Sequence, residues 1–251
     1  MVLHHPRCLS ACLYQGHQLY GAWITELGPQ ETIFERLDRW VGSHAIASVH
    51  WVEATPWFQL IPPGDFPRDV LAAQFLHLFG PESAHPLETG RFAESDAQAV
   101  FALPDAIRLP VQARFSSVKF SHAAQWIGSI LSASKEVLVA IVFPGSFLVG
   151  AFRDGKLLFV RAFSFHHPID AAYHLLSVAN TLDMNPEELT LEWMGMVEQK
   201  SPLTKACRAY FRNQSFPRHT GWQFPEGTAD IPGHFMYHLL TTAECASSVA
   251  V

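Results

Sequence analysis

Histidine is the residue in this sequence best suited to binding metal or moving a proton near neutral pH, and it occurs 14 times in 251 residues. His234 and His238 stand four residues apart in a segment expected to be helical, which places both imidazoles on one face. His166 and His167 adjoin Asp170 at an expected strand-to-helix junction, where capping of the helix or packing is the favoured role. A zinc site needs three or four protein ligands, and neither pair has an identifiable third. No metal site is therefore predicted, and a metal-dependent hydrolase is the weakest of three functional hypotheses.

The sequence motifs of several large enzyme classes are absent. GxSxG, GxxxxGK[ST], GxGxxG and HExxH do not occur. The pair His4-His5 lies in a terminus expected to be mobile and is interpreted as a chance pair. The cysteines form no CxxC pair and are expected to be reduced and buried: Cys8, Cys12, Cys207 and Cys245.

The composition narrows the class of protein. Hydrophobic residues make up 49% of the chain and charged residues 16%, with a formal net charge of −6. This is ample material for a core, and without any run of Lys or Arg a nucleic-acid partner is excluded. The N-terminus lacks the features of a signal peptide, and no apolar stretch is long enough to span a membrane. We expect a cytoplasmic protein with no membrane span.

Three apolar runs between Lys135 and Phe165 predict an antiparallel three-stranded meander. The breaks between them, Pro144-Gly145-Ser146 and Arg153-Asp154-Gly155, carry the glycines that tight hairpin turns favour. A helix beginning near Pro168 and a strand over 189–194 follow. A crossover through a helix makes that strand parallel to one strand of the meander. This is the order of elements in a ribonuclease-H-like half-domain.

The N-terminal half is compatible with a second copy of this arrangement. Strands are expected over 8–14, 18–27, 45–54, 57–61, 98–103 and 118–120. Helices are expected over 30–42, 65–79, 107–111 and 122–131, and a surface loop over 80–97. The predicted fold class is α/β with mixed sheets, an actin-like pair of ribonuclease-H-like halves. The first half spans 1–133. The second spans 134–251 and ends in a helix (203–211), a loop (214–232) and a final helix (234–245).

Three stretches carry a resemblance to a known family: ATPWFQLIPPGDFPRDVLAAQFLHLF (54–79), VFALPDAIRLPVQARF (100–115) and GKLLFVRAFSFHHPIDAAYHLLSVANTLDMNPEELTLEWMG (155–195). They resemble a family of uncharacterised bacterial proteins of about this length, best known from Bacteroidetes, that carry an actin-like ATPase fold. The resemblance covers most of residues 8–212. It implies the fold and brings no assigned activity.

The resemblance also implies where a nucleotide would bind. Active actin-like ATPases hold phosphate in one hairpin turn of each half, where an Asp positions the metal and Gly lets backbone N–H groups approach the anion. The candidate cofactor-binding residues are Gly16, Gly145 and Ser146 in the corresponding turns and Gly195 after the fourth strand of the second half. Neither turn contains an Asp, and Pro144 removes one N–H donor. Without carboxylates, Mg²⁺ has few ligands.

The absence of an Asp from both hairpin turns favours a non-catalytic protein over an ATPase. The first hypothesis is a non-catalytic scaffold that binds an unknown protein partner or forms a homodimer, with no catalytic residues and no cofactor. The alternative is a nucleotide-binding protein or weak ATPase, for which ATP and Mg²⁺ would be the cofactors. Trp222 and Phe224 would be anchors for a partner if exposed, although burial over the sheet is at least as well supported.

Overall fold

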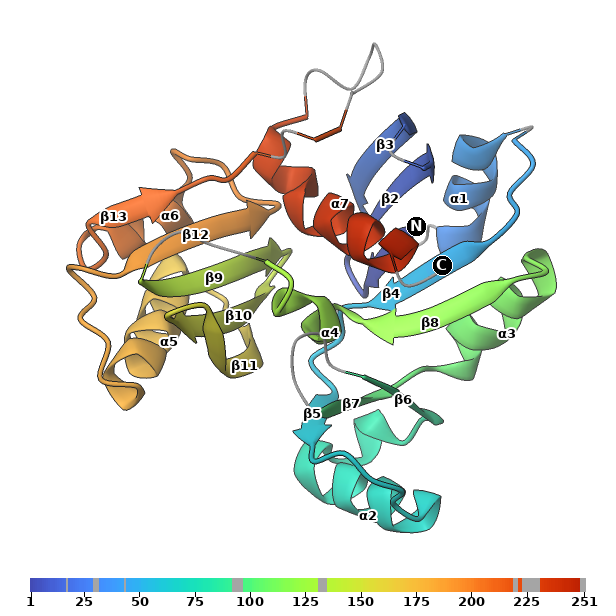
Figure 1. Cartoon of the computed structure of the whole chain (residues 1–251), viewed down its shortest axis with the longest axis horizontal. Helices are drawn as coiled ribbons and strands as arrows, with labels where there is room; N and C mark the ends of the chain where they lie inside the picture. The colour runs from blue at the N-terminus through green and yellow to red at the C-terminus, as the bar shows by residue number, and fades with distance from the viewer. Residues whose placement is uncertain are drawn as a thin grey trace. The chain divides into compact units, whose positions relative to one another are not determined.

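The computed structural model describes residues 1–16, 18–28, 32–42, 44–91, 97–130, 135–218, 221–222 and 231–248, with side chains up to residue 244 (Figure 1). The chain divides into two compact units. Unit 1 comprises Met1–Leu9 and Thr25–Trp126, and unit 2 comprises Ser10–Ile24 and Ile127–Val251. The boundary at 133–134 stays a prediction.

The first sheet has five strands in the order β3-β2-β1-β4-β8. Its strands are β1 (Val2–His5), β2 (Cys8–Gln15), β3 (Gln18–Glu26), β4 (Val49–Glu53) and β8 (Val118–His122). β4 runs parallel to both β1 and β8. The helices of this region are α1 (Ile33–Val41), α3 (Asp105–Arg114) and α4 (Ala123–Ile127). The strand β1 was not predicted, because its four residues read as a polar chain end before Pro6.

A smaller antiparallel sheet in unit 1 has the order β5-β7-β6. Its elements are β5 (Phe58–Ile61), α2 (Arg68–Phe79), the short 3-10 helix η1 (Pro81–Ser83), β6 (Leu87–Arg91) and β7 (Gln98–Ala102). Leu71 and Phe75 of α2 pack on Val100 and Ala102 of β7. The prediction of a plain loop over 80–97 was wrong, because η1 and β6 lie within it. The strand β6 is held by its pairing with β7, and its sequence LETGR shows no apolar alternation.

The second sheet has the order β11-β10-β9-β12-β13. Its elements are β9 (Glu136–Phe143), β10 (Ser146–Arg153), β11 (Lys156–Ser164), α5 (Pro168–Thr181), β12 (Thr190–Gly195), α6 (Pro202–Arg208), β13 (Asn213–Ser215) and α7 (Gly233–Ser248). β10 is antiparallel to β9 and β11, which confirms the predicted meander. β12 pairs in parallel with β9, which confirms the predicted crossover.

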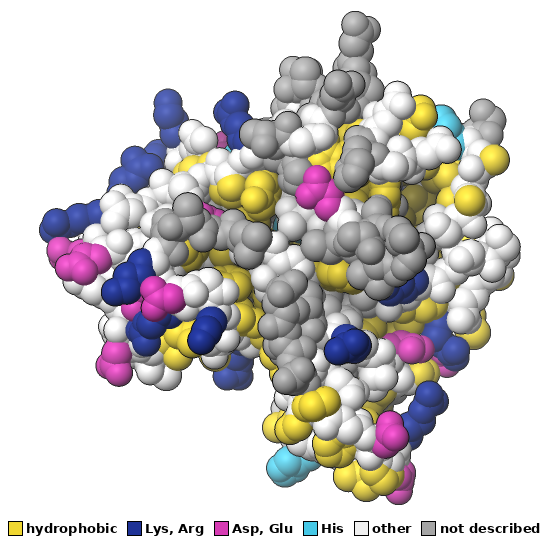
Figure 2. Space-filling model, viewed as in Figure 1, with side chains coloured by type: hydrophobic (Ala, Val, Ile, Leu, Met, Phe, Trp, Pro, Cys, Tyr) yellow, Lys and Arg dark blue, Asp and Glu magenta, His cyan; other side chains and the backbone are white. Residues whose placement is uncertain are grey.

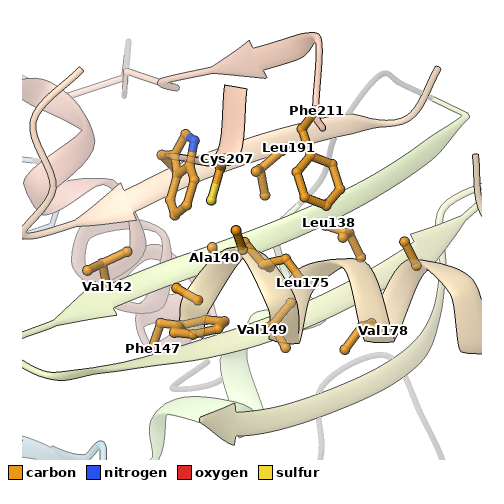
Figure 3. Close-up of a cluster of buried hydrophobic side chains, with 14 of the residues drawn as sticks. Leu138, Ala140, Val142, Phe147, Val149, Leu175, Val178, Leu191, Cys207 and Phe211 are labelled. Carbon is orange, nitrogen blue, oxygen red and sulfur yellow. The ribbon is translucent and has the colours of Figure 1, made fainter. Parts of the chain in front are cut away.

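The core of unit 2 lies between this sheet and the helices α5 and α6 (Figure 3). Side chains from alternate positions of β9, β10 and β12 point to the same face, as the two-residue period of a strand requires. Leu138, Val149 and Leu191 meet Leu175 of α5 and Cys207 of α6 there. Each of these five side chains is fully buried. The apolar runs of the sequence are nearly continuous because the central strands of this sheet are buried on both faces.

The two large sheets repeat one order of elements. Each sheet contains three successive strands, a helix and a fourth strand, in the same chain order and with the same pairing: β1, β2, β3, α1 and β4 in the first, and β9, β10, β11, α5 and β12 in the second. A fifth strand then pairs in parallel with the fourth, β8 with β4 and β13 with β12. The predicted α/β class with mixed sheets is confirmed. None of the described helices is long and apolar enough to cross a membrane.

Two substitutions on α5 test its seating on the sheet. Leu175→Ala removes a fully buried side chain from the core, whereas Ile169→Ala removes one that is 54% exposed on the same helix. We expect Leu175→Ala to lower the free energy of unfolding by about 2–5 kcal/mol and Ile169→Ala by at most about 0.5 kcal/mol. Urea denaturation measures both. Equal losses would contradict this assignment of the core face.

Candidate functional site

The turn between β9 and β10 is the clearest candidate for a phosphate-binding turn in unit 2. Phe143 and Ser146 are paired across it, so Pro144 and Gly145 form a two-residue connection. Gly145 has φ +77°, a conformation that favours glycine. Its carbonyl oxygen accepts a hydrogen bond from the N–H of Phe165 at 2.9 Å. The turn thus contributes no N–H from Pro144 and no carboxylate, and the Gly145 carbonyl already bonds within the unit.

Gly195, the second candidate in unit 2, has a packing role. It ends β12 with φ +77°, and a Cβ atom there would lie 2.4 Å from the carbonyl oxygen of Val142. The next residue, Met196, donates its N–H to that same oxygen at 2.9 Å. The chain can leave β12 this close to β9 only because residue 195 lacks a side chain. Glycine at this position is explained without a nucleotide.

The structure changes the position of the corresponding turn in the first sheet. Since β1 pairs with β4 as β9 pairs with β12, the turn that matches Pro144-Gly145 is Pro6-Arg7, between β1 and β2. Gly16 lies one turn later, between β2 and β3, where the second sheet has Asp154-Gly155. The expectation that placed Gly16 at the first hairpin of its half was wrong, because it overlooked β1. Pro6-Arg7 also contains no carboxylate.

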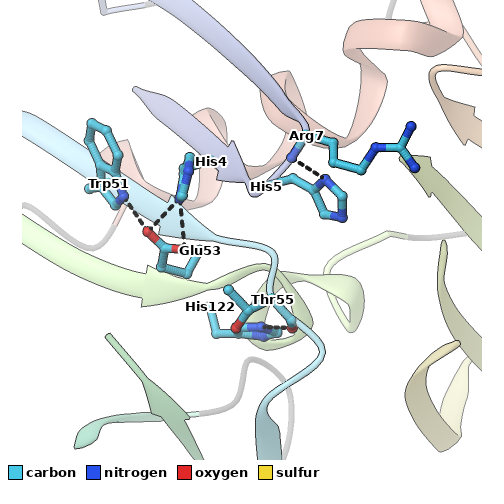
Figure 4. A network of polar contacts seen from close by, with 7 residues as sticks. All are labelled: His4, His5, Arg7, Trp51, Glu53, Thr55 and His122. Carbon is cyan, nitrogen blue, oxygen red and sulfur yellow. Dashed lines mark hydrogen bonds and ion pairs between the residues drawn. The ribbon is translucent and has the colours of Figure 1, made fainter. Parts of the chain in front are cut away.

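A buried polar cluster lies in unit 1, where β1 and β4 end (Figure 4). The carboxylate of Glu53 is 0% exposed and accepts a hydrogen bond from Trp51 Nε1 at 2.7 Å. His4 Nδ1 lies 3.0 Å from both of its oxygens. A carboxylate that orients an imidazole is an arrangement that general bases use. Here both groups are buried, His4 at 6% exposed, so the pair satisfies a buried charge and is closed to substrate.

Sequence reasoning missed Glu53 and read His4-His5 as a chance pair in a mobile terminus. Both histidines are buried in β1. The one available signal was alternation: in Trp51-Val52-Glu53 the strand period places the indole and the carboxylate on one face. That pattern does not reveal that His4 comes from a neighbouring strand, because the pairing of β1 with β4 is a long-range contact.

Two further histidines line the same end of the first sheet. His122 donates from Nε2 to the carbonyl oxygen of Thr55 at 2.9 Å, and its Nδ1 accepts from the N–H of Ala124 at 3.1 Å. His5 Nδ1 accepts from the N–H of Arg7 at 3.1 Å (Figure 4). Both imidazoles therefore bond to the backbone, which fixes turns and strand ends.

Burial keeps these imidazoles neutral. Desolvation lowers the pKa of His122 to about 4 and, together with the nearby charges of His4 and Arg7, lowers the pKa of His5 to about 3. Desolvation, with Lys119 as the next contributor, lowers the pKa of His50 to about 3. Groups with pKa values this low carry no proton near neutral pH and are poor general acids there.

The predicted pair His234 and His238 does lie on one buried face of α7. His234 Nε2 donates to the carbonyl oxygen of Val197 at 2.7 Å, just after the Gly195 turn. His238 is 4% exposed, its ring stands edge-on to Phe143, and neither ring nitrogen has a hydrogen-bond partner among the described residues. Burial lowers the pKa of His234, and lowers that of His238 to about 4. The two rings therefore play different parts.

The other predicted pair, His166 and His167, serves the start of α5. The Asp170 carboxylate accepts the backbone N–H groups of both, at 3.0 and 2.8 Å. These bonds lower the pKa of Asp170, since they favour its charged form. Across the described part of the chain, no group of three or more His, Cys, Asp or Glu side chains is placed to hold a metal ion.

The remaining predicted residues are cysteines and two aromatics of the C-terminal region. Cys8, Cys12 and Cys207 are free and buried, as expected. Burial raises the pKa values of the Cys8 and Cys207 thiols to about 12, so they carry no thiolate near neutral pH. The indole of Trp222 is 5% exposed and meets Tyr14 edge-on, with ring centroids 5.6 Å apart. Burial rules out Trp222 as an exposed anchor; Phe224 and the side chain of Cys245 lie outside the described residues.

Comparisons with known proteins place this geometry in context. A family model described as "Protein of unknown function (DUF3822)" matches residues 5–214. The comparison with curated proteins found no match.

Two solved structures share the fold. A Bacteroides thetaiotaomicron protein described as having an actin-like ATPase fold and unknown function superposes with a TM-score of 0.74, at 16% identity, over 96% of this chain and 94% of that one. The PilM-PilN type IV pilus biogenesis complex gives a TM-score of 0.52 at 10% identity, over 97% of each chain. The predicted actin-like ATPase fold is thereby confirmed. At these identities the likeness concerns the fold alone.

Two glycines with similar backbone conformations test the packing role of Gly195. Gly155 has φ +73° and open space around it, whereas a Cβ at Gly195 would strike Val142. We expect Gly155→Ala to cost about 1 kcal/mol of unfolding free energy from left-handed strain alone. Gly195→Ala should cost about 3 kcal/mol or more, because the clash adds to that strain. Denaturant titration compares them, and equal costs would refute the close approach.

The buried His238 predicts a pH dependence. Its pKa is 6.5 in an ordinary setting and about 4 in the fold, so below pH 6.5 the unfolded chain binds the proton first. Stability should therefore fall as the pH drops from about 6.5 to 4, with about 3 kcal/mol lost through this residue.

The substitution His238→Leu isolates that contribution. Because an unpaired polar ring is replaced by an apolar side chain, we expect the variant to be at least as stable as the native chain at pH 7. It should also show a shallower fall in unfolding free energy between pH 7 and 4, measured by urea denaturation at each pH. A variant much less stable at pH 7 would mean that the imidazole makes a contribution that the fold does not explain.

Proposed function

The chain belongs to the DUF3822 family, whose function is unknown, and we propose that it is a non-catalytic actin-like scaffold that binds another protein in the cytoplasm. The observation that carries the proposal is the state of the β9–β10 turn. Phosphoryl transfer needs Mg²⁺ held near the phosphates by carboxylates, and it needs N–H groups directed at them. The turn has neither Asp nor Glu, Pro144 supplies no N–H, and the Gly145 carbonyl bonds to Phe165.

The other candidate positions support the same proposal. The matching turn of the first sheet, Pro6-Arg7, also begins with proline and has no acid. Its Arg7 N–H is used by the His5 imidazole. Gly195 is required by its approach to Val142. In unit 1 the carboxylate at the end of β4, Glu53, is fully buried and bonded to Trp51 and His4.

A binding role suits a chain that has the actin-like fold but lacks carboxylates in its candidate phosphate-binding turns, because function depends on sites and not on the fold. One structure of the same fold is a chain of the PilM-PilN type IV pilus biogenesis complex. That likeness supports a role in a protein assembly and names no partner for this chain. The proposal covers two kinds of partner, a different protein and a second copy of this chain.

Ligand-dependent thermal stability tests the proposal. A ligand present at a hundred times its dissociation constant stabilises the folded state by about 2.7 kcal/mol. We expect no change in the melting temperature of the full chain with millimolar ATP or ADP and magnesium. A rise with nucleotide that Gly145→Ala abolishes would contradict the proposal and favour the weak ATPase.

Zinc serves as a separate arm of the same measurement. We expect no stabilisation by zinc, because His234 bonds to Val197 and brings no third ligand to His238. Stabilisation that is lost in the variant His234→Ala, His238→Ala would instead support the metal hypothesis. His44→Ala, at an exposed histidine of unit 1, is the control for loose surface binding.

A further inference from the structure

Exposed apolar side chains concentrate on one small part of unit 1. Of the eleven large hydrophobic residues that are exposed in the described chain, five lie between residues 60 and 78: Leu60 37%, Phe66 41%, Val70 53%, Leu76 46% and Leu78 55%. Three of them belong to α2. Figure 2, viewed as in Figure 1, shows hydrophobic surface at the foot of the view, where Figure 1 places α2. Contiguous exposed apolar surface marks interaction sites more often than scattered single residues do.

The apolar residues of α2 are distributed around the helix and not confined to its buried side. Successive residues turn by about 100°, so Leu71 and Phe75 form the stripe that packs on β7. Val70 and Leu78 lie on one flank of that stripe, and Leu76 lies on the other. Both flanks therefore present large apolar side chains to the outside.

Beyond its first two residues, α2 also carries no charged side chain on its exposed surface. From Val70 to Phe79 the sequence VLAAQFLHLF contains no Asp, Glu, Lys or Arg, and Ala72, Ala73 and Gln74 are exposed between the larger residues. A helix that lies on a membrane surface usually carries Lys and Arg on its polar face. The only such residue in α2 is Arg68, at its first turn beside Asp69. The chemistry favours an apolar protein surface over a lipid surface.

The size and shape of the patch bear on what covers it. A twelve-residue helix is about 18 Å long and 10 Å wide, so one face presents roughly 200 Å². A stable interface buries about 800 Å² on each partner. Two copies pairing through α2 would cover one flank of each helix and fall well short of that area. A groove covers the outer face and both flanks of a helix at once, which is how grooves bind apolar helices.

We infer that α2 is a docking helix whose outer face and flanks, carrying Val70, Leu76 and Leu78, insert into an apolar groove of a partner protein. The inference rests on the proposed function, since it names the surface through which the scaffold binds. Buried Leu71 and Phe75 hold the helix on its sheet while it does so.

The experiment uses the full chain carrying a photoreactive benzoylphenylalanine at position 70, cross-linked in cells of its source. The cross-linked protein is identified, purified and titrated with the native chain and with single variants. We expect Leu78→Glu and Leu76→Glu to weaken binding at least tenfold. Leu109→Glu is the matched control, because Leu109 on α3 is 54% exposed and Leu78 is 55% exposed. It should change the affinity less than twofold, and circular dichroism should show all three variants folded.

Several outcomes would overturn the inference. Cross-linking only to a second copy would make α2 a dimer contact, and binding of the chain to neutral phosphatidylcholine vesicles that Leu78→Glu abolishes would make it a lipid contact. A partner that binds native chain, Leu78→Glu and Leu109→Glu equally would refute α2 while leaving the scaffold function intact. The absence of any cross-link from position 70 would refute α2 as well. Nucleotide binding by the native chain would instead contradict the proposed function of a non-catalytic scaffold.

Discussion

The parallel pairing of β12 with β9 is the interaction on which the second half of the molecule depends. It joins the meander to the elements that follow it, and α5 must cross over the sheet to make it. The pairing ends where Gly195 meets the backbone of Val142, and Met196 then bonds to the same carbonyl oxygen. One residue later, the Val197 carbonyl oxygen accepts a hydrogen bond from the imidazole of His234 in α7. A single close approach of two strands therefore sets the position of the final helix.

Packing and backbone contacts account for glycines and histidines that a nucleotide or catalytic site would otherwise explain. Glycines at turns are ambiguous, because tight packing and phosphate binding both require a missing side chain. At Gly195 the structure supplies the packing reason, and at Gly145 it supplies a two-residue turn in which glycine follows Pro144 with a positive φ. Three buried histidines likewise have structural partners. His5 and His122 form hydrogen bonds to the backbone, and His4 bonds to a buried carboxylate. These residues, which the sequence offers as candidates for chemistry, instead stabilise strand ends and turns.

Much of the second half followed from the sequence because its signals are local. The runs of β9, β10 and β11 are apolar on both faces, and Asp154-Gly155 defines a tight turn. Long-range pairing left no such signal. The four residues of β1 form a strand because β2 and β4 pair with them on either side. Missing β1 displaced the first-half turn from Pro6-Arg7 to Gly16.

On α2, the apolar pattern does not show which side chains are buried. The spacing of Val70, Leu71, Phe75 and Leu76 indicates a helix correctly, yet only Leu71 and Phe75 are buried. A small sheet of three strands can cover one face of a twelve-residue helix and no more. The sequence shows which residues are apolar, but it does not show how much surface the rest of the fold can offer to them.

The proposed function requires that the β9–β10 turn does not bind a nucleotide. The most direct measurement is a magnesium–ADP titration of the ¹⁵N-labelled full chain, 28.0 kDa, with the amide signals of Gly145 and Gly195 followed by NMR. We expect neither signal to move at millimolar nucleotide. Saturable shifts of both amides, together with those of neighbouring residues in the turn, would contradict it.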